Sequence, residues 1–271
     1  MLLIDAHVHI YNCFDPAALF SAAARNFRIR ARRMGVETSS SFILLLTEKQ
    51  EDNRFAALSG EASDIGGPGS GPESWQISMT AEKECLVLTG NDHDKIFLIA
   101  GRQTVSREGL EVLALLTGAE FDDGLPASSL IKKIRDAGGV PVIPWAFGKW
   151  SGVRGRVLRR LLEMSGDDFF LGDNGGRPSC LPVPGLLRRE KERGRAVISG
   201  SDPLPLPGEE SRVGSFGIYV DAGLDAAAPV RQLKSLLAGT SSRFRSYGDP
   251  MPFFRFARNQ CLLRRVKTTR G

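Results

Sequence analysis

The first ten residues constrain the fold of this chain more than any other stretch. Met1–Ile10 begins with apolar residues and then carries Asp5, His7 and His9 at alternate positions. Side chains alternate between the two faces of a β-strand, so we expect these three polar side chains to share one face. Two imidazoles beside a carboxylate suit a divalent metal ion, whereas the simpler alternative is a strand end with two solvated histidines. Because two of the chain's three histidines lie here, the sequence favours a metal site.

Short apolar runs alternate with segments of helical spacing along the rest of the chain. The apolar runs predict strands at 41–46, 84–88, 95–100, 110–115, 140–143, 169–171, 196–198 and 215–220. The helical spacing predicts helices at 16–34, 52–58, 126–137, 154–164, 186–192 and 227–238. This alternation is typical of parallel α/β folds, in which polar residues at the carboxyl ends of the strands form the site.

We expect a single domain over residues 1–271. A Gly- and Pro-rich segment at about 59–78 cannot hold a regular element, and we interpret it as a surface insertion or a lid. Positive residues gather in the tail at about 243–271, which we expect to be a solvated terminal helix. The alternative for this tail is a contact to nucleic acid or anionic lipid.

The composition is that of an ordinary globular protein, with 42% hydrophobic residues, 25% charged residues and a net charge of +5. No apolar run approaches the roughly 20 residues that a membrane-spanning helix needs, and the first residues do not resemble a signal peptide. The four cysteines are far apart and show no C-x-x-C spacing, which indicates reduced thiols. We therefore expect a cytoplasmic protein with no membrane span.

The polar strand ends resemble, in chain order, the motifs of the PHP (polymerase and histidinol phosphatase) family of metal-dependent phosphoesterases. Ile4–His9 is similar to the opening H-x-H strand of that family, and Gly200–Leu204 is similar to its G-S-D-A-H motif, with Asp202 kept. Segment 138–147 is similar to G-G-x-x-x-x-A-H-P-F. Other residues stand at several of the family's ligand positions. Glu48 and Lys49 replace the aspartate and the histidine of the T-D-H motif, and Gln103 replaces the glutamate of G-x-E. Glu111 and Trp145 stand where the family has histidines, and Leu204 replaces the last histidine of G-S-D-A-H.

The resemblance implies a distorted, seven-stranded (βα)7 TIM-like barrel of the PHP type. The substitutions imply one divalent metal ion (Zn, Mn or Fe) where the family holds up to three. Its expected ligands are His7, His9, Glu111 and Asp202. Such an ion lowers the pKa of water toward about 7, which makes hydroxide at neutral pH.

The remaining polar strand ends supply candidates for acid–base chemistry and for substrate binding. The eligible acids and bases are Asp5, Glu48 and Asp173. The residues expected to hold a small anionic or phosphorylated substrate are Lys49, Arg102, Trp145, Lys149 and Arg177. Trp145 and Trp150 share a loop that forms either a stacking wall for a ring or a packed cover over the rim.

Three functions are compatible with these residues. The first is a PHP-type hydrolase that cuts a phosphoester or a similar anionic substrate with a metal-activated water. The second is a non-catalytic binding or scaffold protein of the same fold that has lost its metals. The third is a partner of nucleic acid or of a membrane surface, led by the basic tail.

Overall fold

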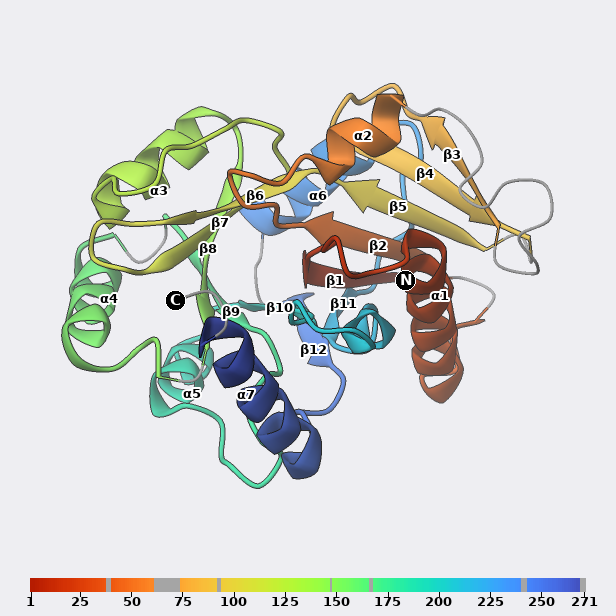
Figure 1. The fold of residues 1–271 in the computed structure, drawn as a ribbon. Coiled ribbons are helices and arrows are strands. Elements are labelled where there is room, and N and C mark those ends of the chain that lie inside the picture. Colours follow the sequence, from red (N-terminus) through yellow and green to blue (C-terminus); the bar gives the residue numbers. More distant parts are fainter. Residues whose placement is uncertain are drawn as a thin grey trace.

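The computed structural model describes residues 1–37, 40–60, 74–91, 94–146, 148–165, 168–239 and 243–268. The strands in these ranges form two sheets (Figure 1). The first has the order β12 (Arg245–Tyr247), β11 (Gly217–Val220), β1 (Leu2–Val8), β2 (Ser41–Leu46), β5 (Lys95–Ile99), β4 (Cys85–Gly90) and β3 (Trp75–Met79). The second has the order β10 (Val197–Ser199), β9 (Phe170–Asp173), β8 (Val140–Trp145), β7 (Glu111–Leu115) and β6 (Gly101–Val105).

The expected parallel barrel is only partly present. Strands β1, β2 and β5 are parallel, as are β8, β9 and β10, but β3, β4 and β5 pair antiparallel, and so do β6, β7 and β8. Neither sheet closes into a barrel in the residues that the structure describes. The reason lies in the short connections, because the links from β4 to β5 and from β6 to β7 hold no crossover helix and therefore form hairpins.

The two sheets nevertheless meet along two seams. At one seam Glu48 and Arg102 form an isolated parallel bridge, in which the Glu48 N–H donates to Gly101 O at 3.0 Å. At the other seam the Asp202 N–H donates to His7 O at 2.8 Å. Here a Cβ on Gly200 would lie 2.1 Å from the His7 nitrogen, so only glycine allows the two strands to approach this closely. The seams bring the carboxyl ends of β1, β2 and β10 together without a continuous ladder.

The helices of the described residues are α1 (Pro16–Arg33), α2 (Arg54–Gly60), α3 (Ala127–Asp136), α4 (Gly152–Ser165), α5 (Gly185–Glu192), α6 (Pro229–Ala238) and α7 (Phe253–Thr268), with a 3-10 helix, η2, at Glu209–Arg212. Helices α1 to α5 pack on the outer faces of the sheets, α6 packs on the core that the two sheets share, and α7 lies in front of the sheets in Figure 1. As predicted, α1 begins after Asp15, whose carboxylate accepts from the N–H groups of Ala17 and Ala18. Among the described residues, no helix has the length and apolar character required to span a bilayer.

Three apolar cores hold these layers together. One packs β1, β2 and β3–β5 against α1 and α2, and another packs β7–β10 against α3, α4 and α5. The third joins both sheets to α6, with Leu2, Ile43, Leu115, Val142 and Ile198 among its buried members. Burial of each such side chain contributes roughly 1.5–3 kcal/mol, so the sheets are fixed relative to each other by their shared core.

Two boundaries of the sequence interpretation need correction. The insertion expected at about 59–78 ends earlier, because β3 begins at Trp75, while residues 61–73 lie outside the described ranges. The basic tail is not only a solvated helix: Arg245–Tyr247 joins the first sheet, and α7 carries the buried residue Asn259. Strands β3, β6 and β12 escaped prediction because each is short and partly polar, without a continuous apolar run.

Candidate metal centre

Three side chains from two strand ends converge at the seam between β1 and β10. His7 Nε2 lies 3.2 Å from His9 Nε2, and Asp202 Oδ1 lies 3.5 Å from the former and 3.6 Å from the latter. Four ligands placed tetrahedrally at about 2.0–2.1 Å from an ion are about 3.4 Å apart, so these three atoms are spaced like three corners of one coordination shell. Within the described part of the chain, these residues form the one group of His, Cys, Asp and Glu suited to hold an ion.

Neutral polar groups complete the surroundings of this triad. Gln103 Oε1 lies 3.3 Å from His7 Nε2, and Thr47 Oγ1 lies 3.4 Å from His9 Nε2. Asn174 Nδ2 donates to Asp202 Oδ2 at 2.8 Å, which leaves Oδ1 turned toward the imidazoles. The triad therefore has further oxygen atoms at hand and a hydrogen bond that orients its carboxylate.

An irregularity in β1 decides which side chains face this site. The register between β1 and β2 shifts between Asp5 and Val8. Ala6 accordingly packs in the core between the sheets, whereas Val8 packs in the core beneath α1. The expectation that Asp5 shares a face with His7 and His9 is therefore wrong, because a bulge interrupts the alternation of side chains between them.

Asp202 is held in position by its backbone. Its φ is 43°, in the left-handed region that few residues other than glycine adopt. The hydrogen bond from its N–H to His7 O fixes this conformation. A strained residue retained at the meeting point of two sheets is often part of a functional site.

The electrostatics favour the protonation states that metal binding needs. Burial, with the neighbouring His7 next in size, lowers the pKa of His9 to about 3, so its imidazole is neutral near pH 7. Burial alone would raise the pKa of Asp202, but the two imidazoles and the bond from Asn174 bring it below its usual range. A neutral imidazole at His9 and an ionised carboxylate at Asp202 are forms that bind a metal ion.

Asp5 lies behind the site rather than in it. Its side chain is fully buried, and its two oxygens accept hydrogen bonds from Ser201 N at 2.7 Å and Gly214 N at 2.8 Å. Burial raises the pKa of Asp5 to about 6. With both oxygens bound to backbone N–H groups, Asp5 ties the loops after β10 and η2 to β1, and it is poorly placed for proton transfer to a substrate.

Glu48 and Arg102 point away from the imidazoles. Because side chains alternate along a strand, Thr47 and Gln103 face the triad, and the two charged residues face the opposite side. Glu48 Oε1 accepts from Phe55 N at 2.8 Å, and Oε2 lies 3.4 Å from Arg102 Nη1. The pair lines a separate cavity of about 430 Å³.

Two more of the predicted carboxylates are also paired with cations. Glu111 forms an ion pair with Lys149 and does not belong to the group around His7. Asp173 accepts two hydrogen bonds from Arg177 Nη1, at 2.8 and 3.0 Å, and both side chains are buried. Arg177 is therefore held by Asp173 instead of facing an open site.

The last two candidates, Lys49 and Trp145, have different surroundings. Lys49 Nζ is 5.7 Å from the centre of the Tyr11 ring, and that ring stacks on His9 at 5.2 Å. Lys49 is therefore near the site but on its aromatic rim. Trp145 and Trp150 pack against the core beneath α3 and α4, which agrees with a packed loop over the rim.

A cavity of about 300 Å³ opens beside the triad. Asp202, Asn174 and Lys149 line one side of it, and Arg212 and residues of α7 line the other. No motif predicted this second wall, because α7 comes from the segment that we expected to be a solvated tail. Arg212 has no distinguishing motif around it in the sequence.

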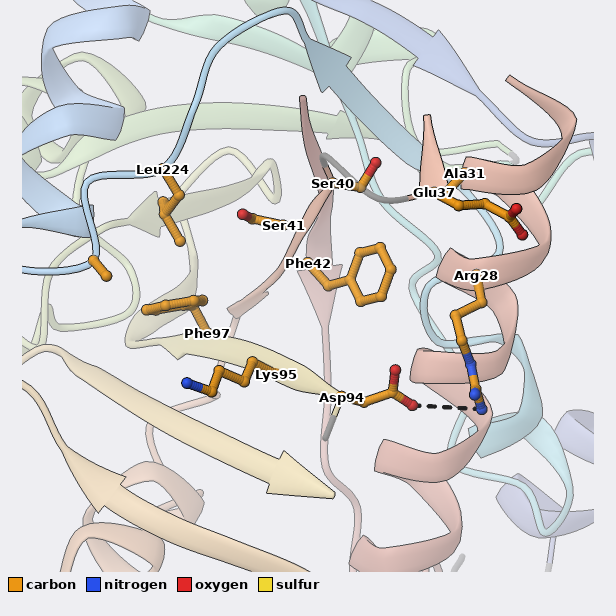
Figure 2. Close-up of a pocket in the computed structure, with 11 residues that line it drawn as sticks. Arg28, Ala31, Glu37, Ser40, Ser41, Phe42, Asp94, Lys95, Phe97 and Leu224 are labelled. Carbon is orange, nitrogen blue, oxygen red and sulfur yellow. Dashed lines mark ion pairs between the residues drawn. The ribbon is translucent and has the colours of Figure 1, made fainter. Parts of the chain in front are cut away.

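Another cavity, of about 460 Å³, lies at the amino ends of β2 and β5 (Figure 2). Phe42 and Phe97 come from these neighbouring strands, and Arg28 of α1 forms an ion pair with Asp94 at 3.4 Å across one side. Catalytic sites of parallel α/β proteins lie at the carboxyl ends of the strands, so the cavity beside Asp202 is the better candidate.

Known structures resemble this chain in fold at low sequence identity. No family model and no curated protein matches the sequence. Among solved structures, PsfC from Pseudomonas syringae has a TM-score of 0.52 and 12% identity, with 97% of each chain covered. A two-domain protein from Bacteroides vulgatus containing a predicted PHP-like metal-dependent phosphoesterase has a TM-score of 0.48 and 14% identity, over 92% of this chain and 64% of that one.

Endonuclease Q from Pyrococcus furiosus, a lesion-specific endonuclease, is similar with a TM-score of 0.49 and 11% identity, over 91% of this chain and 59% of that one. The likeness to PsfC agrees with a mixed α/β arrangement of strands and helices. Identities this low say nothing about activity, and the two chains with lower TM-scores support no inference by themselves. The function must be inferred from the side chains of the site.

Proposed function

We propose that this chain is a metal-dependent hydrolase that acts on a phosphoester or a similar anionic substrate. The observation that carries the proposal is the spacing of His7 Nε2, His9 Nε2 and Asp202 Oδ1, which lie 3.2–3.6 Å apart at a strand end. These three residues would hold one divalent ion. Two nitrogen atoms and one oxygen atom suit Zn, Mn or Fe. Glu111 is left out of the ligand set because it pairs with Lys149.

A divalent ion bound there would supply Lewis acidity and a water whose pKa is lowered toward about 7. Residues of the chain orient these ligands. The Asn174 amide donates a hydrogen bond to the carboxylate of Asp202, and the Asp202 N–H donates to the backbone oxygen of His7. Gln103 Oε1 and Thr47 Oγ1 can accept hydrogen bonds beside the imidazoles. Lys149 lines the adjacent cavity and pairs with Glu111. Because this pair is partly exposed and screened by solvent, the ammonium can also attract an anionic substrate.

Metal binding tests this proposal first. Wild-type protein is stripped with a chelator, dialysed against Zn²⁺ or Mn²⁺, and its metal content is measured by mass spectrometry. We expect about one ion per chain, and an affinity at least about 100-fold lower in His7→Ala and His9→Ala, because loss of a direct ligand exceeds the 10–100-fold effect of indirect ones. His93→Ala removes the third histidine of the chain and serves as the matched control.

Hydrolysis of p-nitrophenyl phosphate with and without the added metal tests the second part. Activity that requires the ion and disappears in His7→Ala supports the hydrolase. A wild-type protein that binds no ion, or binds it without any hydrolysis of phosphate esters, contradicts it.

One observation favours the alternative of a non-catalytic binding protein. Glu48, Glu111 and Asp173 are each neutralised by a nearby cation, so a site for several ions is not available at these carboxylates. If the stripped protein binds phenylphosphonate but the loaded protein hydrolyses no ester, this alternative replaces the hydrolase.

A further inference from the structure

The geometry points to α7 as the wall of a substrate compartment: we propose that its inner face holds the leaving group of a compact organic phosphate while Arg212 binds the phosphoryl oxygens. This inference rests on the proposed function, since it uses the triad as the place of the reaction. It adds a size limit, a chemical character for the leaving group and the residues that determine both.

The inner face of α7 lies across a cavity from Asp202. Phe256, Asn259, Gln260 and Leu263 line the cavity that Asp202 also lines. Positions three, four and seven residues apart lie on one face of a helix, so these side chains form a single surface. The cavity thus has Asp202, one member of the triad, on one side and α7 on the other.

Specific contacts hold α7 in this place. Arg255 Nε donates to Glu209 Oε1 of η2 at 2.8 Å, and Arg255 Nη2 donates to Ser211 Oγ at 3.2 Å. Just before the helix, Met251 forms a parallel bridge with Pro178, and its N–H donates to Gly175 O at 3.0 Å. The helix is therefore tied to the loops that follow β9 and β10, which are the loops that form the site.

Arg212 provides a positive charge on the wall of the cavity. Its side chain is buried and lines the cavity, and its described ion pair is with Glu209, at 3.7 Å. Glu209 is shared with Arg255 at a shorter distance of 2.8 Å, so one carboxylate faces two guanidinium groups. A guanidinium binds phosphoryl oxygens in bidentate fashion, which assigns Arg212 to the anionic part of the substrate.

The other residues that line the cavity determine the size and polarity of the leaving group that fits. A volume of about 300 Å³ is at the lower end of the roughly 300–1,000 Å³ that small-molecule sites occupy. Phe256, Leu263 and Met251 offer apolar surface. Asn259 is buried, and the hydrogen bond described for its side chain runs to a sulfur at 3.8 Å, so its amide retains strong bonding capacity. The leaving group is therefore small and partly apolar, with a group that bonds to an amide.

Steady-state kinetics of the metal-loaded protein test the compartment. The substrates are p-nitrophenyl phosphate and a 20-nucleotide single-stranded DNA. We expect hydrolysis of the small ester, with cleavage of the DNA at least 100-fold slower in kcat/KM. Arg212→Met should raise KM for the small ester at least 10-fold, and Arg212→Lys should restore part of that loss. Leu263→Trp, which fills the cavity without removing a charge, should raise KM by a similar factor.

Matched variants on the outer face of α7 serve as controls. Phe254 is 86% exposed and Arg258 is exposed, and neither lines the cavity. Phe254→Ala and Arg258→Met should leave KM unchanged, whereas Phe256→Ala should change the preference among esters of different size. Far-UV circular dichroism verifies that each variant is folded.

Binding of phenylphosphonate to the chelator-treated protein, measured by calorimetry, separates this inference from the proposed function. Binding that weakens in Arg212→Met and Leu263→Trp, in a protein without hydrolase activity, supports the compartment and removes the hydrolase. Hydrolysis whose KM is unchanged in Arg212→Met, Arg212→Lys and Leu263→Trp overturns the compartment and leaves the hydrolase. Efficient cleavage of the DNA also overturns it, because a polymer does not fit under α7.

Discussion

The two sides of the candidate site differ in whether their carboxylates are paired with cations. At the seam between β1 and β10, Asp202 faces two imidazoles, and Asp5 accepts hydrogen bonds from the N–H groups of Ser201 and Gly214. At the ends of β2, β7 and β9, each carboxylate has a cationic partner: Glu48 with Arg102, Glu111 with Lys149 and Asp173 with Arg177. Only the first side keeps negative charge available for an ion.

This difference explains how a site surrounded by several carboxylates can hold a single metal ion. A carboxylate that is already neutralised by a guanidinium or an ammonium has little to gain from a metal ion and would first have to lose its partner. On the other side, an ion would neutralise Asp202 and use the lone pairs of two neutral imidazoles. The ion pairs therefore stabilise the fold, while the triad remains for chemistry.

The largest effect is expected where the buried ion pair is broken. In Arg177→Met, Asp173 is left as a buried carboxylate with one N–H donor, that of Gly175. We expect the free energy of unfolding to fall by about 3–5 kcal/mol, measured by urea denaturation. Asp173→Asn in the same chain should restore part of it. Arg188→Met breaks a solvent-exposed pair with Glu192 and should change stability by less than about 0.5 kcal/mol.

The second prediction concerns Asp5, the buried carboxylate with no described cationic partner. Burial raises its pKa from an ordinary 3.8 to about 6, so between these pH values the folded protein binds more protons than the unfolded chain. Stability contributed by this proton is present below pH 4 and is lost as the pH rises through 6. The free energy of unfolding of metal-free wild type, minus that of Asp5→Asn, should fall by roughly 2.4 kcal/mol from pH 4 to pH 7.

Asp122→Asn, at an exposed carboxylate, is the control for this titration. A difference between wild type and Asp5→Asn that stays constant across this pH range would show that the charge of Asp5 is compensated in some other way.

The third prediction compares two carboxylates directly as metal ligands. Asp202→Asn should weaken Zn²⁺ binding at least about 100-fold, because it removes a charged ligand. Glu111→Gln should weaken it by less than about 3-fold, since Glu111 is bound to Lys149. Competition with a chromophoric chelator measures both affinities. Equal losses in the two variants would place Glu111 in the coordination shell and abolish the distinction between the two sides.

The smallest effect is expected for the partly exposed ion pair between Lys149 and Glu111. The side chains of Lys149 and Glu111 are 38% and 18% exposed, so solvent screens their attraction. A double-mutant cycle of Lys149→Met and Glu111→Gln should give a coupling energy of about 0.2–1 kcal/mol in urea denaturation. The same cycle for Asp173 and Arg177 should give a clearly larger value. Similar couplings would mean that burial does not separate these pairs.

Local patterns were sufficient for much of the secondary structure. The N-cap at Asp15 places the start of α1, and the apolar runs place β2, β5, β7 and β8, because capping and burial are properties of neighbouring residues. The spacing of His7 and His9 likewise predicts that their side chains lie together, as they do at 3.2 Å. The link to Asp202 rested on the convergence expected of polar strand ends in a parallel α/β fold and on the resemblance to a family motif, since nothing local connects residues so far apart in sequence.

The sequence by itself determined the strand ends and the pair of imidazoles, since both depend on the alternation of side chains along a few residues. The tertiary structure alone decided that a bulge turns Asp5 away, that cations neutralise three carboxylates, and that α7 lies against the site. Each of these depends on contacts between distant segments. Their free energy comes from burial and charge in the folded state, which no local pattern records.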